Sequence, residues 1–192
     1  MRTLIINKIR ESIQVKEAIL ADEALLAVIE QVVDQMIGAL VNDNTIFLAG
    51  NGGSSSDAQH IAAELVGRFY KERKGLAAEA LTANTAILTA LGNDYGYDSI
   101  FARQIEARAK KGDVFIGLST SGNSQNILNA IAECKNIGVT TVGMTGLTGG
   151  KMANDCDMCI KIPSKDTPRI QESHITIGHI ICELVENAFS QS

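Results

Sequence analysis

Residues 45–64 read TIFLAGNGGSSSDAQHIAAE, and this order of residue types predicts the fold. The apolar run 45–49 is typical of a buried strand, and the glycines and serines that follow lead into a helical pattern. Such a turn presents free backbone N–H groups and the positive end of the helix dipole. Within that helix, His60 and Glu64 are about 40° apart around the axis and share one face. The stretch therefore predicts an anion site beside a His/Glu pair, which suits chemistry on a phosphorylated small molecule.

Strand and helix patterns alternate along the chain after this stretch. Alternation of this kind predicts a parallel sheet with helices on both faces, and ligands bind beyond the carboxyl ends of such strands. We predict five strands, at 45–49, 77–82, 113–118, 139–144 and 157–162, and helices at 55–67, 84–91, 98–110, 124–137 and 168–189.

The segment 1–43 precedes the first strand and shows helical spacing of apolar residues over 4–20 and 23–42. Asp22 is placed to cap the second of these helices. We expect the segment to pack on the sheet or against a neighbouring subunit, and both interpretations stay open. No linker interrupts the chain, so we expect a single domain over 1–192.

Composition excludes several classes of protein. The net charge of −5 argues against a general nucleic-acid binder, which would usually carry a basic face. We find no apolar run approaching the ~18 residues of a membrane span, and the N-terminus lacks the apolar centre of a signal peptide. The four cysteines do not form a disulfide pattern for a chain this long. We therefore expect a cytoplasmic protein with no nucleic-acid or membrane partner.

A second strand–loop–helix pattern carries similar chemistry. After the strand 113–118 come Ser119-Thr120-Ser121-Gly122-Asn123-Ser124, whose hydroxyls can donate to phosphate oxygens. Taken alone, this is a serine-rich turn with Ser124 as the helix N-cap. Two such loops at one edge of one sheet could clamp a single ligand from two sides.

Three nucleotide or hydrolase motifs each fail at a definite position. A Walker A loop ending at Gly150-Lys151 would need glycine at 145 and a hydroxyl at 152, where Thr145 and Met152 stand. A dinucleotide fingerprint has Ser55 in place of its third glycine, and a nucleophile elbow has Ser121 in place of its last glycine. The pattern Cys156-Asp157-Met158-Cys159 lies on a predicted strand, where its cysteines would point to opposite faces, so we favour buried thiols over a zinc clip.

The C-terminal segment 167–184 starts like a helix, with Thr167 as cap and Pro168 in the first turn. His174 and His179 are about 140° apart around its axis and cannot share one site, and we favour a packed core role for His174. For His179 the core and the functional interpretation are balanced. Gln171 lies about 12 Å along the axis from His179, so a site that used both would most simply draw on two copies of the helix.

Taken together, the motifs resemble those of the bacterial phosphoheptose isomerases, which belong to the sugar isomerase (SIS) domain group. The resemblance rests on residues 50–64, on Gly92-Asn93-Asp94-Tyr95-Gly96, on the loop 119–124 and on Arg169-Ile170-Gln171-Glu172 with the two histidines that follow. It covers nearly the whole chain in order. The departures, Ser55-Ser56 and Pro168, remove no proposed functional group.

The resemblance implies a flavodoxin-like three-layer α/β sandwich formed by a single SIS domain. It implies conversion of sedoheptulose 7-phosphate to D-glycero-D-manno-heptose 7-phosphate, the first step toward heptose units of lipopolysaccharide and other surface glycans. It also implies a homotetramer with active sites at subunit interfaces and one zinc ion per subunit.

Roles for individual residues follow from the same resemblance. The metal ligands would be His60, Glu64, Gln171 and His179. The phosphate would be bound by Ser119, Thr120, Ser121 and Ser124, and the sugar by Asn51, Gly52, Gly53, Glu64, Asn93, Asp94 and Gln171. Interconversion of a ketose and an aldose through an enediol needs a base and an acid, which we assign to Glu64 and His179.

Two alternatives remain at this point. One is a tetrameric adaptor of the replication initiator-associating type, which shares the fold and differs from the isomerases at the positions of Glu64 and His179. This chain keeps both residues, which favours the enzyme. The other is an SIS isomerase of a different sugar phosphate, because the loops recognise a phosphate without counting sugar carbons.

Overall fold

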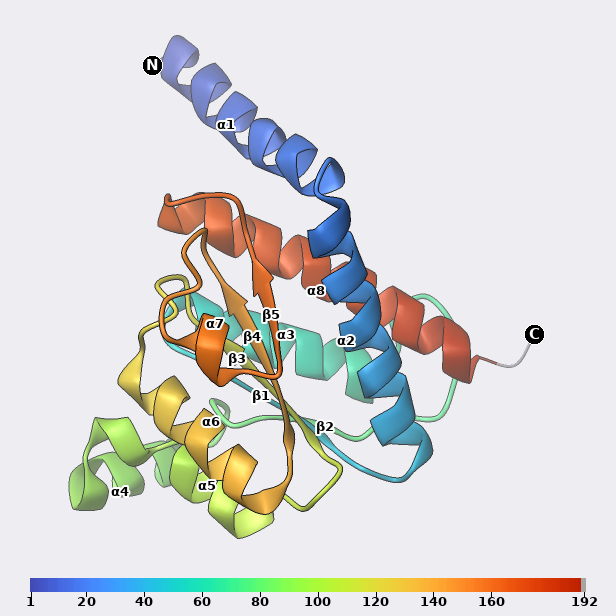
Figure 1. Cartoon of the computed structure of the whole chain (residues 1–192), viewed down its shortest axis with the longest axis vertical. Helices are drawn as coiled ribbons and strands as arrows, with labels where there is room; N and C mark the ends of the chain where they lie inside the picture. The colour runs from blue at the N-terminus through green and yellow to red at the C-terminus, as the bar shows by residue number, and fades with distance from the viewer. Residues whose placement is uncertain (191–192) are drawn as a thin grey trace.

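The computed structural model describes residues 1–190 and shows a five-stranded parallel sheet between two layers of helices (Figure 1). The strands β1 (Ile46–Gly50), β2 (Ala78–Ala80), β3 (Val114–Leu118), β4 (Thr140–Thr145) and β5 (Met158–Lys161) lie in the order β2-β1-β3-β4-β5. This order confirms the predicted flavodoxin-like sandwich, and its direction reverses between β1 and β3. The two glycine- and serine-rich loops follow these two strands and flank the place where ligands bind in such sheets.

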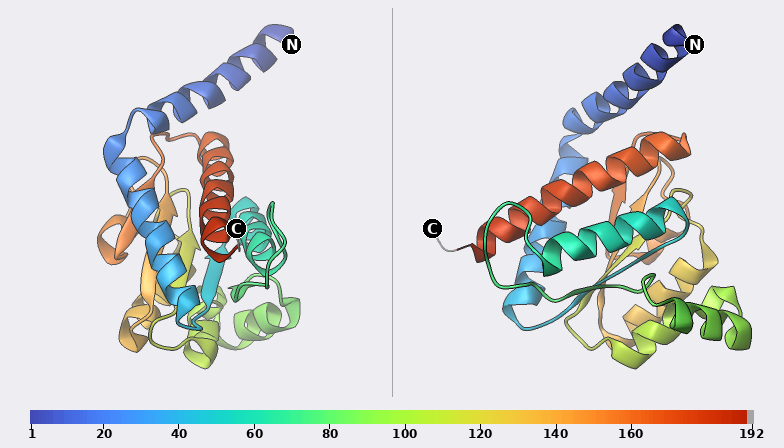
Figure 2. Two further views of the ribbon diagram at one scale, coloured as in Figure 1. Left: turned by 90° about the vertical axis from the view of Figure 1, so that its right-hand side faces the viewer. Right: turned by 180° about the vertical axis from the view of Figure 1, so that it is seen from behind.

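The strand residues alternate between two hydrophobic clusters, one on each face of the sheet. In β1, Ile46 and Leu48 pack into one cluster and Phe47 and Ala49 into the other, because successive side chains point to opposite faces. The first face is covered by α2 (Glu23–Val41), α3 (Gly53–Val66) and α8 (Thr167–Phe189). The second is covered by α4 (Thr85–Tyr95), α5 (Ala102–Arg108), α6 (Gln125–Ile137) and α7 (Met152–Asp155), as Figure 2 shows from two sides.

Helix α2 is a core helix. Asp22 caps its N-terminus, as predicted: the Asp22 side chain accepts a hydrogen bond from the Leu25 N–H at 3.0 Å. By length and composition α2 is apolar enough to cross a membrane, although Glu30 and Asp34 interrupt its apolar residues. Its buried residues, among them Val32 and Met36, pack on the sheet, and core helices pass the same test.

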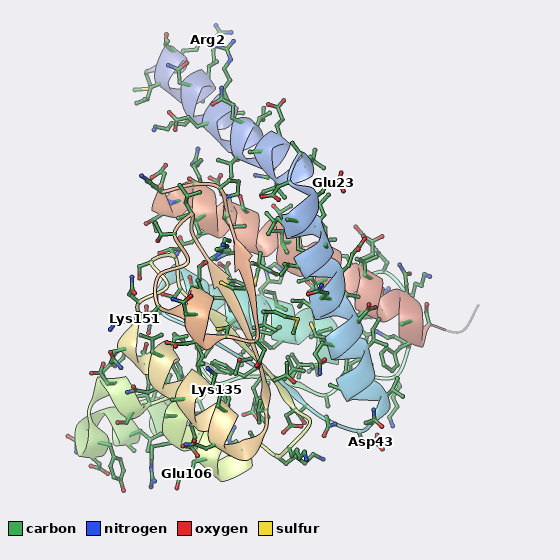
Figure 3. All side chains as sticks on the ribbon, viewed as in Figure 1. Arg2, Glu23, Asp43, Glu106, Lys135 and Lys151 are labelled. Atoms are coloured by element: carbon green, nitrogen blue, oxygen red, sulfur yellow. The ribbon has the colours of Figure 1, made fainter. Side chains whose placement is uncertain are left out.

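Helix α1 (Arg2–Leu20) projects away from the rest of the molecule (Figure 1), and its side chains extend into solvent along most of its length (Figure 3). Within it only Ile19 is buried, whereas Leu4, Ile5, Ile9 and Ile13 are about half exposed. Of the segment 1–43, α2 therefore packs on the sheet and α1 leaves an apolar stripe uncovered. Packing of α1 against a neighbouring subunit stays a prediction.

Several helix boundaries differ from the predicted ones. The predicted helix 98–110 is divided into a 3₁₀ turn, Tyr97–Ser99, and α5, and the short α7 was not predicted. Helix α4 continues to Tyr95, so Asn93 and Asp94 lie in its last turn rather than beyond its end. Asp166, not Thr167, occupies the N-cap position of α8, and it makes no side-chain capping bond. The last two residues of the predicted domain, 191–192, lie outside the described residues.

The expectation that Cys156 and Cys159 point to opposite faces is also wrong. Cys156 ends α7 and precedes β5, so the alternation of a strand does not apply to it. Both sulfur atoms lie beside Gly143, at 3.1 and 3.4 Å from the position a Cβ would take there. Both side chains are half-buried free thiols, and burial raises the pKa of Cys156 to about 12. Thiols of this kind are protonated and unreactive near neutral pH.

Candidate functional site

The candidate site is built where α3 and α8 lie side by side on one face of the sheet (Figure 2). The two helices run parallel, since Gln171 contacts Gly53 near the start of both and Cys182 contacts Ile61 further along. Close approach depends on Gly178, where a Cβ would lie 2.6 Å from the Ile61 side chain. The residue after this glycine is His179, so the close contact places its ring beside α3.

Three predicted ligands meet at this contact. The His60 Nε2 atom lies 3.1 Å from Glu64 Oε1 and 3.4 Å from His179 Nε2, and the two rings pack edge to face with centroids 4.8 Å apart. One ligand atom from each of the three residues falls within 4.8 Å of the others. Two imidazoles and a carboxylate are ordinary zinc ligands, so the residues brought together here fit a zinc ion. The His/Glu pair predicted from residues 45–64 is therefore confirmed in position, and His179 joins it.

Gln171, the fourth predicted ligand, lies elsewhere in this chain. Its carboxamide packs on Gly53, where a Cβ would be 2.7 Å from Gln171 Nε2. Gly53 is the first residue of α3, about 10 Å along the helix axis from His60. Within one chain, Gln171 therefore stands beside the predicted sugar loop and not in the cluster. The prediction that one metal site draws Gln171 and His179 from two copies of α8 is compatible with this placement.

The loop after β1 is held by side chains from distant parts of the chain. The amides of Asn51 and Asn126 exchange two hydrogen bonds, of 2.9 and 3.0 Å, and the Tyr97 hydroxyl donates to the same Asn51 oxygen at 2.9 Å. The Asn51 oxygen is thus fully used inside the protein. Gly52 is exposed and has a positive φ of 57°, a conformation that favours glycine. The loop therefore offers a ligand mainly its backbone and one amide N–H.

The loop after β3 gathers hydroxyl groups. Ser119 Oγ lies 2.8 Å from Ser124 Oγ and 3.5 Å from Ser121 Oγ. Ser124 holds the N-cap position of α6 without capping it, because its hydroxyl is engaged with Ser119. Gly122 has a φ of 66°, and any side chain there would overlap the Gly149 backbone. The converging hydroxyls and the adjacent helix N-terminus form a cradle suited to an anion.

Asn93 and Asp94 are exposed at the end of α4 and hydrogen-bond to each other at 2.8 Å. Tyr97, in the turn that follows, connects this segment to the first loop through Asn51. It also lines a small hollow of about 100 Å³ together with Gly50 and Gly52. Sequence reasoning missed the roles of Asn126 and Tyr97, because a contact between residues far apart in sequence leaves no local signal.

His174 has the packed role that was predicted for it. Its side chain is fully buried, and its Nε2 lies 3.2 Å from the Thr145 carbonyl oxygen. Burial lowers the pKa of His174 to about 4, against a smaller opposing effect of the Thr145 contact. The residue is therefore neutral near pH 7 and serves the fold.

Asp57, one turn before His60, is a further carboxyl group on the same face of α3. Burial raises its pKa, while the charges of His60 and His179 act in the opposite direction. Its Oδ2 atom is buried without a hydrogen-bond partner among the described residues. The sequence placed Asp57 in the motif without assigning it a role.

Comparisons with known proteins agree with this geometry. The family profile described as SIS domain matches residues 9–146. The chain is 62% identical over 188 residues to a phosphoheptose isomerase of Aneurinibacillus thermoaerophilus, covering 98% of this chain and 95% of the relative. It is 58% identical over 176 residues to phosphoheptose isomerase 2 of Campylobacter jejuni, covering 92% of this chain and 88% of the relative.

Solved structures with the same architecture include two phosphoheptose isomerases. That of Neisseria gonorrhoeae superimposes with a TM-score of 0.90 at 39% identity, covering 97% of this chain and 98% of the other. That of Francisella tularensis gives a TM-score of 0.92 at 34% identity, covering 96% and 97%.

Proposed function

Because the chain belongs to the phosphoheptose isomerase family of SIS-domain proteins, we propose that it converts sedoheptulose 7-phosphate to D-glycero-D-manno-heptose 7-phosphate. The chain is an isomerase. The observation that carries the proposal is the meeting of His60, Glu64 and His179 between α3 and α8, on the same sheet as a hydroxyl-lined loop. An adaptor protein would have no need of this cluster, and the family membership does not favour the adaptor or an isomerase of another sugar phosphate.

We propose one zinc ion per subunit, held by His60, Glu64 and His179, with Gln171 supplied by a neighbouring subunit. The facing nitrogen atoms of His60 and His179, 3.4 Å apart beside a carboxylate, fit a shared cation. Bound there, zinc would polarise the oxygens at C1 and C2 of the sugar. The oxygen of a glutamine amide completes a set of nitrogen and oxygen ligands that zinc accepts.

The reaction moves one proton between neighbouring carbons. Glu64 takes a proton from C1 of the ketose, and the carbonyl oxygen at C2 gains a proton from His179, which gives an enediol. Return of a proton to C2 and loss of the hydroxyl proton at O1 give the aldose. Atoms and charge balance, because every proton removed is returned by the same pair of residues or by solvent.

Substrate binding falls to the loops at the carboxyl ends of β1 and β3. Ser119, Thr120, Ser121 and Ser124 would hold the phosphate, where the hydroxyls converge at the start of α6. Gly52 and Gly53 would present backbone N–H groups to the sugar, with Asn51, Asn93, Asp94 and Gln171 around them. These assignments place the phosphate on one loop and the reacting carbons near α3.

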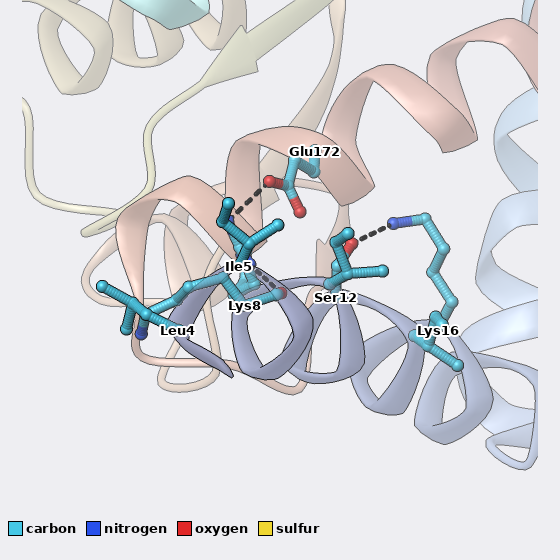
Figure 4. A pocket seen from close by; sticks show the side chains of 9 residues that line it. Leu4, Ile5, Lys8, Ser12, Lys16 and Glu172 are labelled. Carbon is cyan, nitrogen blue, oxygen red and sulfur yellow. Dashed lines mark hydrogen bonds and ion pairs between the residues drawn. The ribbon is translucent and has the colours of Figure 1, made fainter. Parts of the chain in front are cut away.

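We propose that the enzyme acts as a cytoplasmic homotetramer with active sites between subunits. Two observations support association. Gln171 is separated from the other three ligands within one chain, and α1 leaves apolar residues exposed. A groove of about 590 Å³ runs between α1 and the start of α8 (Figure 4). Its lining combines Leu4, Ile5, Ile9 and Ile13 with the polar or charged residues Lys8, Ser12, Lys16, Arg169 and Glu172. Burial of this stripe by other copies would remove it from water.

The product would feed heptose synthesis for lipopolysaccharide or other surface glycans. The test of function is incubation of the purified protein with sedoheptulose 7-phosphate, before and after chelation and after zinc is resupplied. We expect an aldose 7-phosphate that disappears with chelation and returns with zinc. Absence of aldose under all three conditions would point to the adaptor.

A further inference from the structure

A buried carboxylate on α8 has no part in the site described above. Glu186 is 1% exposed, and it lies on α8 about 10 Å beyond His179 and about 20° around the axis. Its two oxygens accept hydrogen bonds from three consecutive backbone N–H groups, those of Phe69, Tyr70 and Lys71, at 2.7, 2.6 and 2.9 Å. Burial alone would raise the pKa of Glu186, but these bonds and Arg73 lower it, so the carboxylate stays charged.

Arg73 pairs with this carboxylate and covers the end of α3. Its side chain is 2% exposed, and its Nε lies 3.2 Å from Glu186 Oε1. The guanidinium donates hydrogen bonds to the carbonyl oxygens of Glu64 and Leu65, at 3.0 and 2.9 Å, and to that of Gly67 at 3.0 Å. The last carbonyls of a helix have no partner within the helix, so Arg73 stabilises the final turn of α3.

The segment 67–77 between α3 and β2 contains neither helix nor strand, and the contacts of this ion pair hold its first part, from Gly67 to Arg73. The pair reaches the candidate site by two routes. Arg73 donates a hydrogen bond to the backbone carbonyl of Glu64 itself. Glu186 accepts from the backbone N–H of Phe69, whose ring lies 5.6 Å from the His179 ring between centroids. One buried pair therefore supports both α3 and α8 at the place where the cluster forms.

We propose that Glu186 and Arg73 are positioning residues, which hold Glu64 and His179 in the geometry that the cluster requires without contacting substrate. The inference rests on the proposed function for the chemistry that this geometry serves. The phosphate loop stands on β3 and α6, apart from the pair. Loss of the pair should therefore lower kcat and zinc affinity while KM changes little. Mutation of residues that orient metal ligands without binding the metal typically lowers metal affinity or activity 10- to 100-fold.

The test is Glu186→Gln, which keeps the shape of the side chain and removes its charge. Asp113→Asn is a matched control, because Asp113 is also 1% exposed and also accepts backbone N–H groups, from Thr45 and Lys110. Asp113 lies before β3, at the amino ends of the strands and away from the cluster. Both variants should unfold at lower temperature than the wild type.

Three readouts separate positioning from general destabilisation: the imidazole NMR signals of His179, zinc affinity by competition with a coloured chelator, and the separate values of kcat and KM. In Glu186→Gln we expect shifted His179 signals, zinc affinity about 10-fold lower and kcat about 10-fold lower. In Asp113→Asn all three should match the wild type. Unchanged His179 signals and zinc affinity in folded Glu186→Gln would overturn the proposal.

A second variant covers the case in which Glu186→Gln does not fold. Arg73→Lys keeps the charge but replaces the planar guanidinium, which donates from two nitrogens to the carbonyls of Glu64, Leu65 and Gly67, with one compact ammonium, and it should give the same three changes. If the proposed function is wrong, the wild type itself gives the negative results. A wild type that neither isomerises the sugar nor binds zinc would contradict that function, and the His179 signals of the variants would still decide whether the pair positions the cluster.

Discussion

The two strand–loop–helix units of this fold share a topology and divide the chemistry between them. In the first unit, β1 and α3, the loop side chain Asn51 is occupied by internal hydrogen bonds, and the paired side chains His60 and Glu64 lie on the helix. In the second, β3 and α6, the hydroxyls stand on the loop and Asn126 on the helix serves to hold the first loop. If the proposed roles hold, one local pattern supplies an anion site or a proton-transfer site, depending on where its polar residues fall.

The largest expected effect comes from removing the carboxylate of the first unit. Glu64→Gln keeps the size of the side chain and abolishes its basicity, so kcat should fall about 10³-fold while KM for sedoheptulose 7-phosphate changes little. Steady-state kinetics on the zinc-loaded protein measure both. A variant with near-normal turnover would remove Glu64 from the catalytic role.

The next effect is on the pH dependence of stability and concerns His174 of α8, which contacts the end of β4 beside the second unit. Its pKa of about 4 in the fold lies below the ordinary value of 6.5, so the unfolded chain takes up a proton first as the pH falls. The free energy of unfolding should therefore decrease by about 3 kcal/mol between pH 6.5 and pH 4.

This decrease in the free energy of unfolding should be absent from His174→Gln, whose amide can still donate to the Thr145 carbonyl. Denaturant unfolding at a series of pH values measures it. Glu186 also loses stabilisation in acid, but only as the pH falls through its lowered pKa, below 4.5. Equal slopes for wild type and variant between pH 6.5 and 4 would contradict the structural role of His174.

A smaller effect is expected from the hydroxyls of the second unit. Ser124→Ala removes the hydroxyl that we propose donates to the phosphate. Hydrogen bonds to charged groups contribute about 1.5–3 kcal/mol, so KM should rise about 10-fold or more with kcat nearly unchanged. Ser56→Ala, an exposed serine on the first unit's helix, is the control and should leave both constants unaltered. A fall in kcat alone for Ser124→Ala would contradict the assignment of phosphate binding to the second unit and proton transfer to the first.

The smallest effect tests the contact between the units. Tyr97→Phe loses one exposed hydrogen bond to Asn51 and keeps the ring, so kcat/KM should fall about threefold. A loss as large as that of Ser124→Ala would mean that the tyrosine hydroxyl itself meets the substrate.

Much of this arrangement could be predicted because it is local. The alternation of apolar runs and helical patterns gave the parallel sheet, and the spacing of His60 and Glu64 placed both on one face of α3. The capping of α2 by Asp22 followed from residue type alone. These features depend on neighbours within one or two helical turns.

The rest depends on contacts between distant segments, which the sequence does not display. The position of Gln171 beside Gly53 follows from the parallel packing of α3 and α8, which Gly178 permits. The Asn51–Asn126 pair and the Glu186–Arg73 pair each join residues from different elements. The projection of α1 could not be predicted either, because its apolar spacing is equally typical of a helix that packs on the sheet.

We propose that Glu64 moves the proton while the second unit only holds the phosphate. Exchange of the C1 protons of sedoheptulose 7-phosphate with solvent deuterium, followed by NMR, tests it most directly, because exchange reports proton removal apart from product release. We predict rapid exchange in the wild type, exchange about 10³-fold slower in Glu64→Gln, and a wild-type rate in Ser124→Ala at saturating substrate. Exchange in Glu64→Gln at the wild-type rate would contradict the account.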